Sequence, residues 1–153
     1  MNAKAEILVV DDNAADVRLS LHALRRHGAP KDVAIVRDGE EALEYVFRTG
    51  RYANDVPVPS NLKLILLDLK LPKVDGFEVL RAVKGNESTR SIPVVVLSSS
   101  RQDRDLRESY RLGANSYVQK PVDFDRYEEL IDLIKTYWLK VNHPLPTSPP
   151  GGD

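Results

Sequence analysis

Short apolar runs alternate along this chain with segments whose apolar residues repeat at helical spacing, and this alternation limits the possible folds most. The runs Ile7-Leu8-Val9-Val10 and Leu64-Ile65-Leu66-Leu67 contain no polar residue. A strand has this composition when both of its faces are buried, as in a parallel sheet between two layers of helices. The pattern therefore predicts a doubly wound α/β domain with a five-stranded parallel sheet.

Capping and turn residues between the apolar segments set the expected boundaries. Asn13 is a candidate helix cap, and Gly28 lies just past the end of the helix that Asn13 would open. Predicted strands occupy about residues 7–10, 33–36, 64–67, 93–97 and 116–119, and predicted helices about residues 14–24, 40–47, 76–83, 103–112 and 123–141. The polar, proline-containing residues 51–61 are expected to project as a loop. We expect one domain over residues 1–142 and a flexible tail over residues 143–153.

Composition narrows the class of protein. The 153 residues suffice for one domain with a core, and the net charge of −1 gives no indication of nucleic acid or an anionic membrane as a partner. The chain has no cysteine, which excludes disulfides and thiolate metal sites. No apolar run approaches the ~20 residues that a membrane helix needs, and no signal peptide precedes the first strand. We therefore expect a cytoplasmic protein.

Polar residues follow the predicted strands at the points where the strands end. The first strand is followed by Asp11-Asp12, the third by Asp68, the fourth by Ser98 and the fifth by Lys120. Ligand sites of open α/β sheets lie outside the carboxyl ends of the strands. Taken alone, such an Asp is commonly a turn or cap residue, and a lone Lys or Ser usually faces water. Because all five lie at strand ends, we expect them to form one site.

The residue types of this site indicate phosphoryl chemistry. Three carboxylates in one cleft repel one another unless a pKa rises or a cation binds, and a site of oxygen ligands suits Mg²⁺. A carboxylate can attack phosphorus and form an aspartyl phosphate. Such a transfer requires positive charge near the phosphoryl oxygens. Lys120 can supply that charge beside Mg²⁺, and Ser98 can donate a hydrogen bond.

The chain resembles the receiver domains of two-component response regulators over about residues 5–140. The resemblance rests on short motifs in the correct order and spacing: Val9-Val10-Asp11-Asp12-Asn13, Leu67-Asp68-Leu69-Lys70-Leu71-Pro72, Asp75-Gly76, Val96-Leu97-Ser98-Ser99 and Lys120-Pro121. It implies the flavodoxin-like receiver fold with strand order 2-1-3-4-5. It also implies a signalling switch, rather than an enzyme acting on other substrates, that accepts a phosphoryl group from a histidine kinase.

The resemblance assigns a role to each residue of the catalytic site. It implies that Asp68 is the phosphoacceptor and that Asp12, Asp68 and the backbone carbonyl of Lys70 bind Mg²⁺ directly. Asp11 is expected to assist in binding Mg²⁺, often through a metal-bound water. Lys120 is expected to pair with the phosphoryl group, and the peptide bond between Lys120 and the following proline is expected to be cis.

The resemblance also implies a switch. The Ser98 hydroxyl is expected to move toward the phosphoryl oxygens, and Tyr117 to rotate into the space it leaves. That movement would change the surface of the fourth helix, fifth strand and fifth helix. The alternative for Tyr117 is an ordinary edge-strand aromatic. Lys70 and Ser100, each two residues beyond a site residue, are expected to tune dephosphorylation.

The last predicted helix carries more apolar residues than one packing face requires. One stripe is expected to face the sheet: Phe124, Tyr127, Ile131, Ile134, Trp138 and Val141. Five further residues are predicted to form a homodimer surface across the fourth helix, fifth strand and fifth helix: Leu106, Tyr110, Leu130, Leu133 and Tyr137. The alternative is that long side chains or loops cover this excess.

Three less specific stretches resemble the single-domain response regulators that partner bacterial phytochrome histidine kinases: residues 50–54, 109–115 and 137–139. This resemblance implies a bacteriophytochrome as the kinase. No output domain follows the predicted domain, so we expect the signal to pass through protein–protein contact or onward phosphotransfer.

Two other classes of protein fit this sequence less well. A phosphohydrolase of the haloacid dehalogenase type would require a second Asp two residues after the nucleophile, where this chain has Lys70. An interaction module that is not phosphorylated would be expected to lack Asp68, Lys120 or the acidic pair, and none of these is missing.

Overall fold

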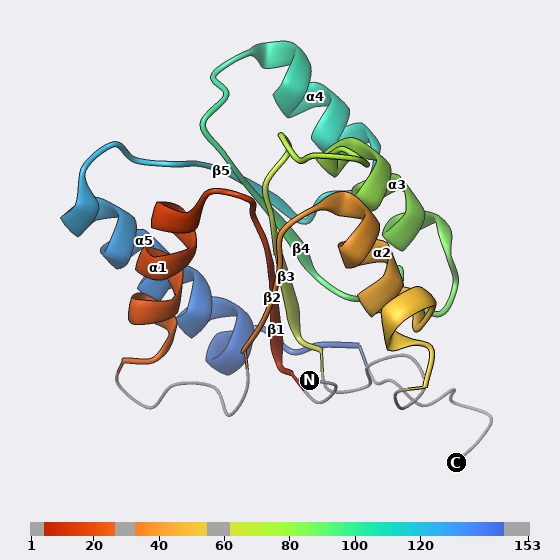
Figure 1. Cartoon of the computed structure of the whole chain (residues 1–153). Helices are drawn as coiled ribbons and strands as arrows, with labels where there is room; N and C mark the ends of the chain where they lie inside the picture. The colour runs from red at the N-terminus through yellow and green to blue at the C-terminus, as the bar shows by residue number, and fades with distance from the viewer. Residues whose placement is uncertain (1–4, 27–32, 55–61, 146–153) are drawn as a thin grey trace.

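The computed structural model of the chain describes residues 5–26, 33–54 and 62–145. Five parallel strands form one sheet in the order β2-β1-β3-β4-β5 (Figure 1). The strands are β1 (Ile7–Val10), β2 (Val33–Val36), β3 (Leu64–Leu67), β4 (Val94–Ser98) and β5 (Ser116–Gln119). The predicted fold class and strand order are confirmed, and each predicted strand lies within one residue of its observed position.

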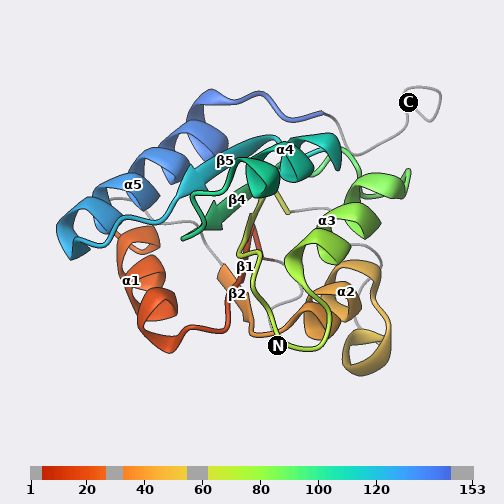
Figure 2. The same ribbon diagram turned by 90° about the horizontal axis from the view of Figure 1, so that it is seen from above.

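Helices cover both faces of the sheet (Figure 2). On one face lie α1 (Ala14–Leu24) and α5 (Phe124–Thr136), and on the other lie α2 (Gly39–Phe47), α3 (Gly76–Gly85) and α4 (Asp103–Arg111). A short 3-10 helix, η1 (Gly50–Tyr52), follows α2, and a π-helical turn, η2 (Tyr137–Val141), continues α5. Within the described ranges, no helix has both the length and the apolar composition needed to cross a bilayer.

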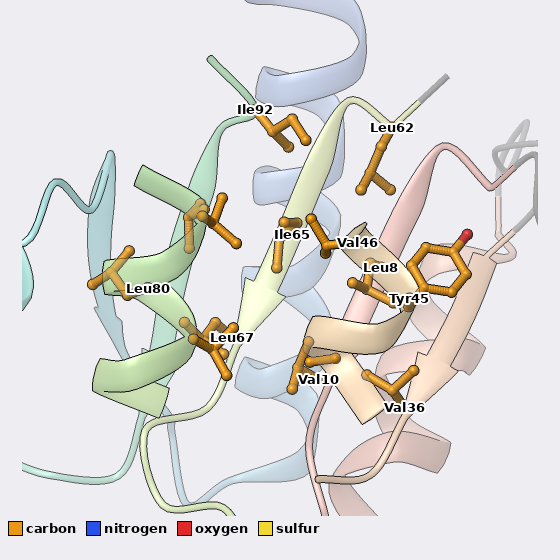
Figure 3. Packing of buried hydrophobic residues seen from close by; sticks show 14 of the residues in the cluster. Leu8, Val10, Val36, Tyr45, Val46, Leu62, Ile65, Leu67, Leu80 and Ile92 are labelled. Atoms are coloured by element: carbon orange, nitrogen blue, oxygen red, sulfur yellow. The ribbon is translucent and has the colours of Figure 1, made fainter. Parts of the chain in front are cut away.

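The central strands are buried because each face of the sheet has its own apolar core. Leu8, Val10, Ile65 and Leu67 point toward the α2–α3 side (Figure 3). The alternate residues of the same strands, such as Val9 and Leu66, pack on the α1–α5 side. Successive side chains of a strand face opposite ways, so two covered faces require an apolar residue at every position. This explains the uninterrupted runs in the sequence.

Four helices begin with the same capping arrangement. The side chains of Asn13, Asp38, Asp75 and Asp123 each accept a hydrogen bond from a backbone N–H of the first turn of α1, α2, α3 and α5. A capped N-terminus satisfies donors that have no partner inside the helix. These caps fix where each helix leaves the carboxyl edge of the sheet, which is the edge that carries the site.

Two parts of the sequence interpretation need revision, and two further segments lie outside the described residues. The start of the expected loop forms η1, and Tyr52 is buried there against the ring of Tyr45, with 5.1 Å between ring centroids. Residues 55–61 of that loop and residues 146–153 of the predicted tail lie outside the described residues. The stripe of α5 is confirmed in its middle, but Phe124 and Val141 are 68% and 56% exposed. The prediction was wrong for both ends because only the central turns contact the sheet.

Candidate functional site

Strand register brings the predicted site residues to one edge of the sheet. Val10 pairs with Leu67 in the ladder between β1 and β3, so Asp11 and Asp68 leave adjacent strands side by side. The backbone N–H of Asp68 donates to the carbonyl of Val10 at 3.0 Å. Between the neighbouring strands β4 and β5, the backbone N–H of Lys120 donates to the Ser98 carbonyl at 2.8 Å. The four strand ends therefore meet, as the sequence predicted.

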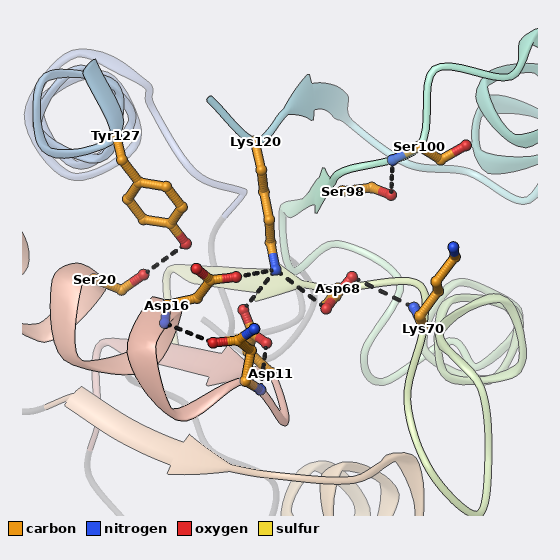
Figure 4. A network of polar contacts seen from close by, with 10 residues as sticks. Asp11, Asp16, Ser20, Asp68, Lys70, Ser98, Ser100, Lys120 and Tyr127 are labelled. Carbon is orange, nitrogen blue, oxygen red and sulfur yellow. Dashed lines mark hydrogen bonds and ion pairs between the residues drawn. The ribbon is translucent and has the colours of Figure 1, made fainter. Parts of the chain in front are cut away.

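The ammonium group of Lys120 lies among three carboxylates (Figure 4). Its Nζ is 3.0 Å from Asp11 Oδ2, 2.9 Å from Asp16 Oδ2 and 3.2 Å from Asp68 Oδ2. The Lys120 side chain is only 9% exposed. A buried charge is stable only when it is paired and hydrogen-bonded, and these three contacts satisfy all three ammonium donors.

Burial and charge act in opposite directions on this cluster. Burial lowers the pKa of Lys120, but the hydrogen bond that Lys120 donates to Asp16 and the charges of Asp68 and Asp11 outweigh this effect, so the pKa lies above its usual value. Burial raises the pKa of Asp11, and the nearby charge of Lys120 opposes this effect. The lysine is therefore charged at neutral pH and available to compensate negative charge at Asp68.

Three carboxylates of the site can converge on one cation. Asp11, Asp12 and Asp68 each offer an oxygen, and these oxygens lie within 4.8 Å of one another. Asp11 is held in place because its Oδ1 accepts from the backbone N–H of Asn13 at 3.0 Å. Oxygen-only ligands suit Mg²⁺, Mn²⁺ and Ca²⁺, and Lys120 alone cannot neutralise the group. The residues therefore fit a divalent metal ion.

The loop after Asp68 runs directly beside the Asp68 carboxylate. The backbone N–H of Lys70 lies 3.4 Å from Asp68 Oδ1, which places the main chain of this residue at the site. The Lys70 side chain is exposed and points away from the ion-pair cluster (Figure 4). Its ammonium is not among the contacts of Asp68.

Ser100 connects the predicted switch residues to α4. Its backbone N–H donates to Ser98 Oγ at 3.1 Å, and its carbonyl accepts from the Tyr117 hydroxyl at 3.2 Å. The Ser100 hydroxyl itself donates to Asp105 Oδ2, in the first turn of α4, at 2.6 Å. Ser98 is buried and the Tyr117 ring is half-buried against the α2–α3 core. Ser100 therefore links the Ser98 hydroxyl to both Tyr117 and α4.

An open cleft of about 360 Å³ lies between the loop after β3 and the start of α4. Its lining includes Lys70, Phe77, Ser98, Ser100 and Arg104. The cleft reaches the buried hydroxyl of Ser98 from the surface. It thus gives a reactant or water a route to the edge of the site.

Two features of the site differ from the sequence interpretation. The described residues contain no cis peptide bond, so the prediction of a cis bond between Lys120 and Pro121 was wrong. The trans form is the intrinsically preferred one even before proline. Asp16 was missed, although it makes the shortest of the three contacts with Lys120. The available signal was its position on the first turn of a helix that starts at the site.

The comparisons with known proteins agree with this geometry. The family model described as the response regulator receiver domain matches residues 7–132. The probable methanogenesis regulatory protein FilR2 of Methanothrix harundinacea is 42% identical over 136 residues, covering 89% of this chain and 84% of FilR2. Response regulator Rcp1 of Synechocystis is 38% identical over 139 residues, covering 91% of this chain and 92% of Rcp1.

Two solved structures of similar proteins also superpose on this one. The phosphorylated cyanobacterial phytochrome response regulator RcpA has a TM-score of 0.84 and 40% identity, covering 92% of this chain and 97% of RcpA. The Mn²⁺-bound form of Rcp1 has a TM-score of 0.84 and 35% identity, covering 92% of this chain and 99% of Rcp1. With the family match spanning most of the chain, these findings show that the protein belongs to the response regulators of two-component phosphorelays, as a receiver domain.

Proposed function

We propose that Asp68 is the phosphoacceptor of this receiver and that the phosphorylated chain signals through contacts with other proteins. One observation carries the proposal: the Asp68 carboxylate shares the sheet edge with two further carboxylates and lies 3.2 Å from the buried ammonium of Lys120. A carboxylate nucleophile beside a cation site and a fixed positive charge meets the requirements of phosphoryl transfer.

The proposed reaction begins with attack of an Asp68 oxygen on the phosphorus of a phosphohistidine. The new P–O bond forms as the P–N bond breaks, and the imidazole leaves with the electron pair. Mg²⁺, when bound, supplies positive charge to the phosphoryl oxygens, and Asp11, Asp12, Asp68 and the Lys70 carbonyl are the proposed ligands. Lys120 pairs with the same oxygens. Water later attacks the phosphorus, releases phosphate and restores the carboxylate, so the chain catalyses only its own phosphorylation and dephosphorylation.

The proposed switch uses the contacts of Ser100. A phosphoryl group adds acceptor oxygens and negative charge near Ser98, and these oxygens draw the Ser98 hydroxyl away from the Ser100 N–H. The loop that Ser100 belongs to also holds the Tyr117 hydroxyl and Asp105 of α4. Loss of the hydrogen bond from the Ser100 N–H to the Ser98 hydroxyl therefore shifts the positions of Tyr117 and α4, which changes the α4–β5–α5 surface. Lys70 and Ser100 remain candidates for tuning dephosphorylation.

The proposed kinase is a bacterial phytochrome. Support comes from the similarity to RcpA, a phytochrome response regulator that covers nearly the whole described chain. The proposed compartment is the cytoplasm, because a kinase makes phosphohistidine from ATP. The chain is also similar to FilR2, a probable methanogenesis regulatory protein. A test of a phytochrome as the kinase therefore needs a kinase of another class for comparison.

Phosphotransfer from radiolabelled kinases tests these assignments. We expect a phytochrome kinase to label the wild-type chain stoichiometrically and faster than a kinase of another class, and Asp68→Asn to remain unlabelled. Asp125→Asn is the control, since Asp125 is an exposed first-turn residue of α5. Label on Asp68→Asn would overturn the acceptor assignment, and equal rates from both kinases would overturn the phytochrome assignment.

The proposed homodimer rests on the α4–β5–α5 surface. Leu133, Tyr110, Tyr137 and Leu106 are 69%, 50%, 48% and 37% exposed there. Leu130 is half-buried against the α1–α5 core, so it contributes less to this surface than the other four. Large apolar side chains that gather on one exposed face commonly mark an interface. Charged residues of α4, including the Arg111–Glu108 pair, border it and suit a polar rim.

A further inference from the structure

We propose that Asp16 is a positioning residue that holds the Lys120 ammonium, so that the lysine and a bound metal ion do not compete for the same carboxylate oxygens. The inference rests on the proposed metal-assisted phosphorylation of Asp68 and concerns the state before phosphoryl transfer. It adds a fourth carboxylate to the site, with a task different from those of the other three.

The contact between Asp16 and Lys120 joins distant parts of the chain. Asp16 lies in the first turn of α1, and Lys120 follows the last strand of the sheet, 104 residues later. Asp16 Oδ2 lies 2.9 Å from Lys120 Nζ, closer than either Asp11 or Asp68. The Asp16 side chain is 23% exposed, whereas that of Lys120 is 9% exposed. Asp16 thus reaches inward from the rim of the site to a nearly buried cation.

Helix capping does not account for this arrangement. Acidic residues are favoured in the first turn of a helix, and a carboxylate facing solvent would serve that purpose equally well. The N-cap of α1 is Asn13, whose Oδ1 accepts from the backbone N–H of Asp16 at 3.0 Å. The carboxylate of Asp16 instead points at Lys120 (Figure 4).

The carboxylates of the site divide into two overlapping sets. Asp11 and Asp68 contact Lys120 and also belong to the group that can hold a metal ion, together with Asp12. Asp16 contacts Lys120 but is outside that group. When a divalent ion takes oxygens of Asp11 and Asp68, Asp16 is the remaining carboxylate among the three that Lys120 contacts. Without it, the ammonium would stay on the oxygens that the metal requires.

Metal affinity of the unphosphorylated, full-length chain tests the inference. Calorimetric titration with Mn²⁺ compares the wild type, Asp16→Asn and Asp125→Asn. Asp125 is the matched control because it is a first-turn acid of α5 and is not a partner of Lys120 in the described structure. We expect Asp16→Asn to weaken Mn²⁺ binding about tenfold, because one negative charge is lost and the lysine competes. The control is expected to stay within roughly twofold of the wild type.

A second background separates positioning of the lysine from a simple charge effect. Lys120→Met removes the competing ammonium, so we expect it to tighten Mn²⁺ binding and to reduce the cost of Asp16→Asn to less than roughly threefold. The inference is overturned if Asp16→Asn binds Mn²⁺ as the wild type does, or if the loss is equal in both backgrounds. Circular dichroism verifies that each variant is folded. A wild-type chain that binds no Mn²⁺ would overturn the proposed metal-assisted function itself, which distinguishes the two failures.

Discussion

Gly76 allows the first turn of α3 to lie directly against the backbone of Asp68, the proposed phosphoacceptor. A Cβ atom at this position would lie 2.4 Å from the Asp68 carbonyl oxygen and 2.5 Å from the Leu69 Cα. The Gly76 N–H donates to the Leu69 carbonyl at 2.8 Å, so the close approach is also hydrogen-bonded. Because the obstructing atoms belong to the main chain, a larger residue would displace the segment that carries Asp68.

We therefore predict that Gly76→Ala destabilises the protein by about 2 kcal/mol and weakens Mn²⁺ binding. Gly85→Ala, in the last turn of the same helix, is the matched control, since a Cβ there meets nothing within 4 Å. This control should be neutral or stabilising by up to about 1 kcal/mol, because Ala is the better helix former. Urea unfolding measures both, and equal stability of the two variants would contradict the steric argument.

Site residues were predictable where residue type and strand end coincide, and only there. Asp11, Asp68 and Lys120 were identified because the ends of parallel strands meet at one edge regardless of side-chain detail. Asp16 sits on a helix, where an acid in the first turn has an ordinary explanation. Its contact with Lys120 depends on how α1 is placed over the sheet, which no local pattern encodes.

Helices α1 and α5 are joined by a buried polar contact as well as by apolar packing. The hydroxyls of Ser20 and Tyr127 lie 3.2 Å apart in the middle of the interface. At the end of α1, Lys135 donates to the Arg26 carbonyl at 2.6 Å. Lys135 thereby satisfies a carbonyl that the helix leaves without a partner. These contacts fix the position of α5 relative to α1, whose first turn carries Asp16.

Because of Tyr127, the free energy of unfolding should depend on pH in the alkaline range. Burial raises its pKa to about 12, whereas an unfolded tyrosine has a pKa of about 10. The contribution of Tyr127 to the free energy of unfolding is complete below the pKa that Tyr127 has in the unfolded state. It is lost as the pH rises through the pKa that Tyr127 has in the folded state. We predict that the wild type loses about 1 kcal/mol more than Tyr127→Phe between about pH 9 and pH 11, measured by urea unfolding.

The control for this prediction is Tyr137→Phe, because Tyr137 is 48% exposed. Its pH dependence should follow that of the wild type. Tyr52, whose pKa burial also raises to about 12, is present in all three proteins and cancels in the comparison. Parallel pH profiles for Tyr127→Phe and the wild type would refute a role for the buried phenol.

Elements were more predictable in their middles than at their ends. The bounds of β1 and β3 agreed with the apolar runs because both faces of these strands are covered. The end of α2 depends on a left-handed residue, and the structure places Arg48 there with φ 56°, at a position where no glycine in the sequence indicated it. A non-glycine cap of this kind is set by tertiary contacts, since left-handed backbone is unfavourable for such residues.

At the scale of the whole molecule, the apolar side chains that remain exposed are the basis of the proposed homodimer. Core burial leaves Leu133 of α5 69% exposed beside Tyr137, and Leu106 and Tyr110 of α4 lie across β5 from them. A twofold interface uses the same surface of both subunits, so one dimer would bury two copies of each of these side chains. One substitution to a charged residue would therefore place two charges in the interface of the dimer.

We predict that Leu133→Glu weakens the homodimer by at least about 100-fold, because burying each leucine contributes roughly 1.5–3 kcal/mol. Val122→Glu is the matched control: Val122 is 94% exposed in the β5–α5 loop and is not among the five residues of the proposed surface, so the dimer of this variant should be unaffected. Sedimentation at micromolar concentration, with and without an acyl-phosphate mimic, measures both. A monomeric wild type under both conditions would exclude the dimer. A control as strongly weakened as Leu133→Glu would show that the loss does not depend on the proposed surface and would overturn its assignment.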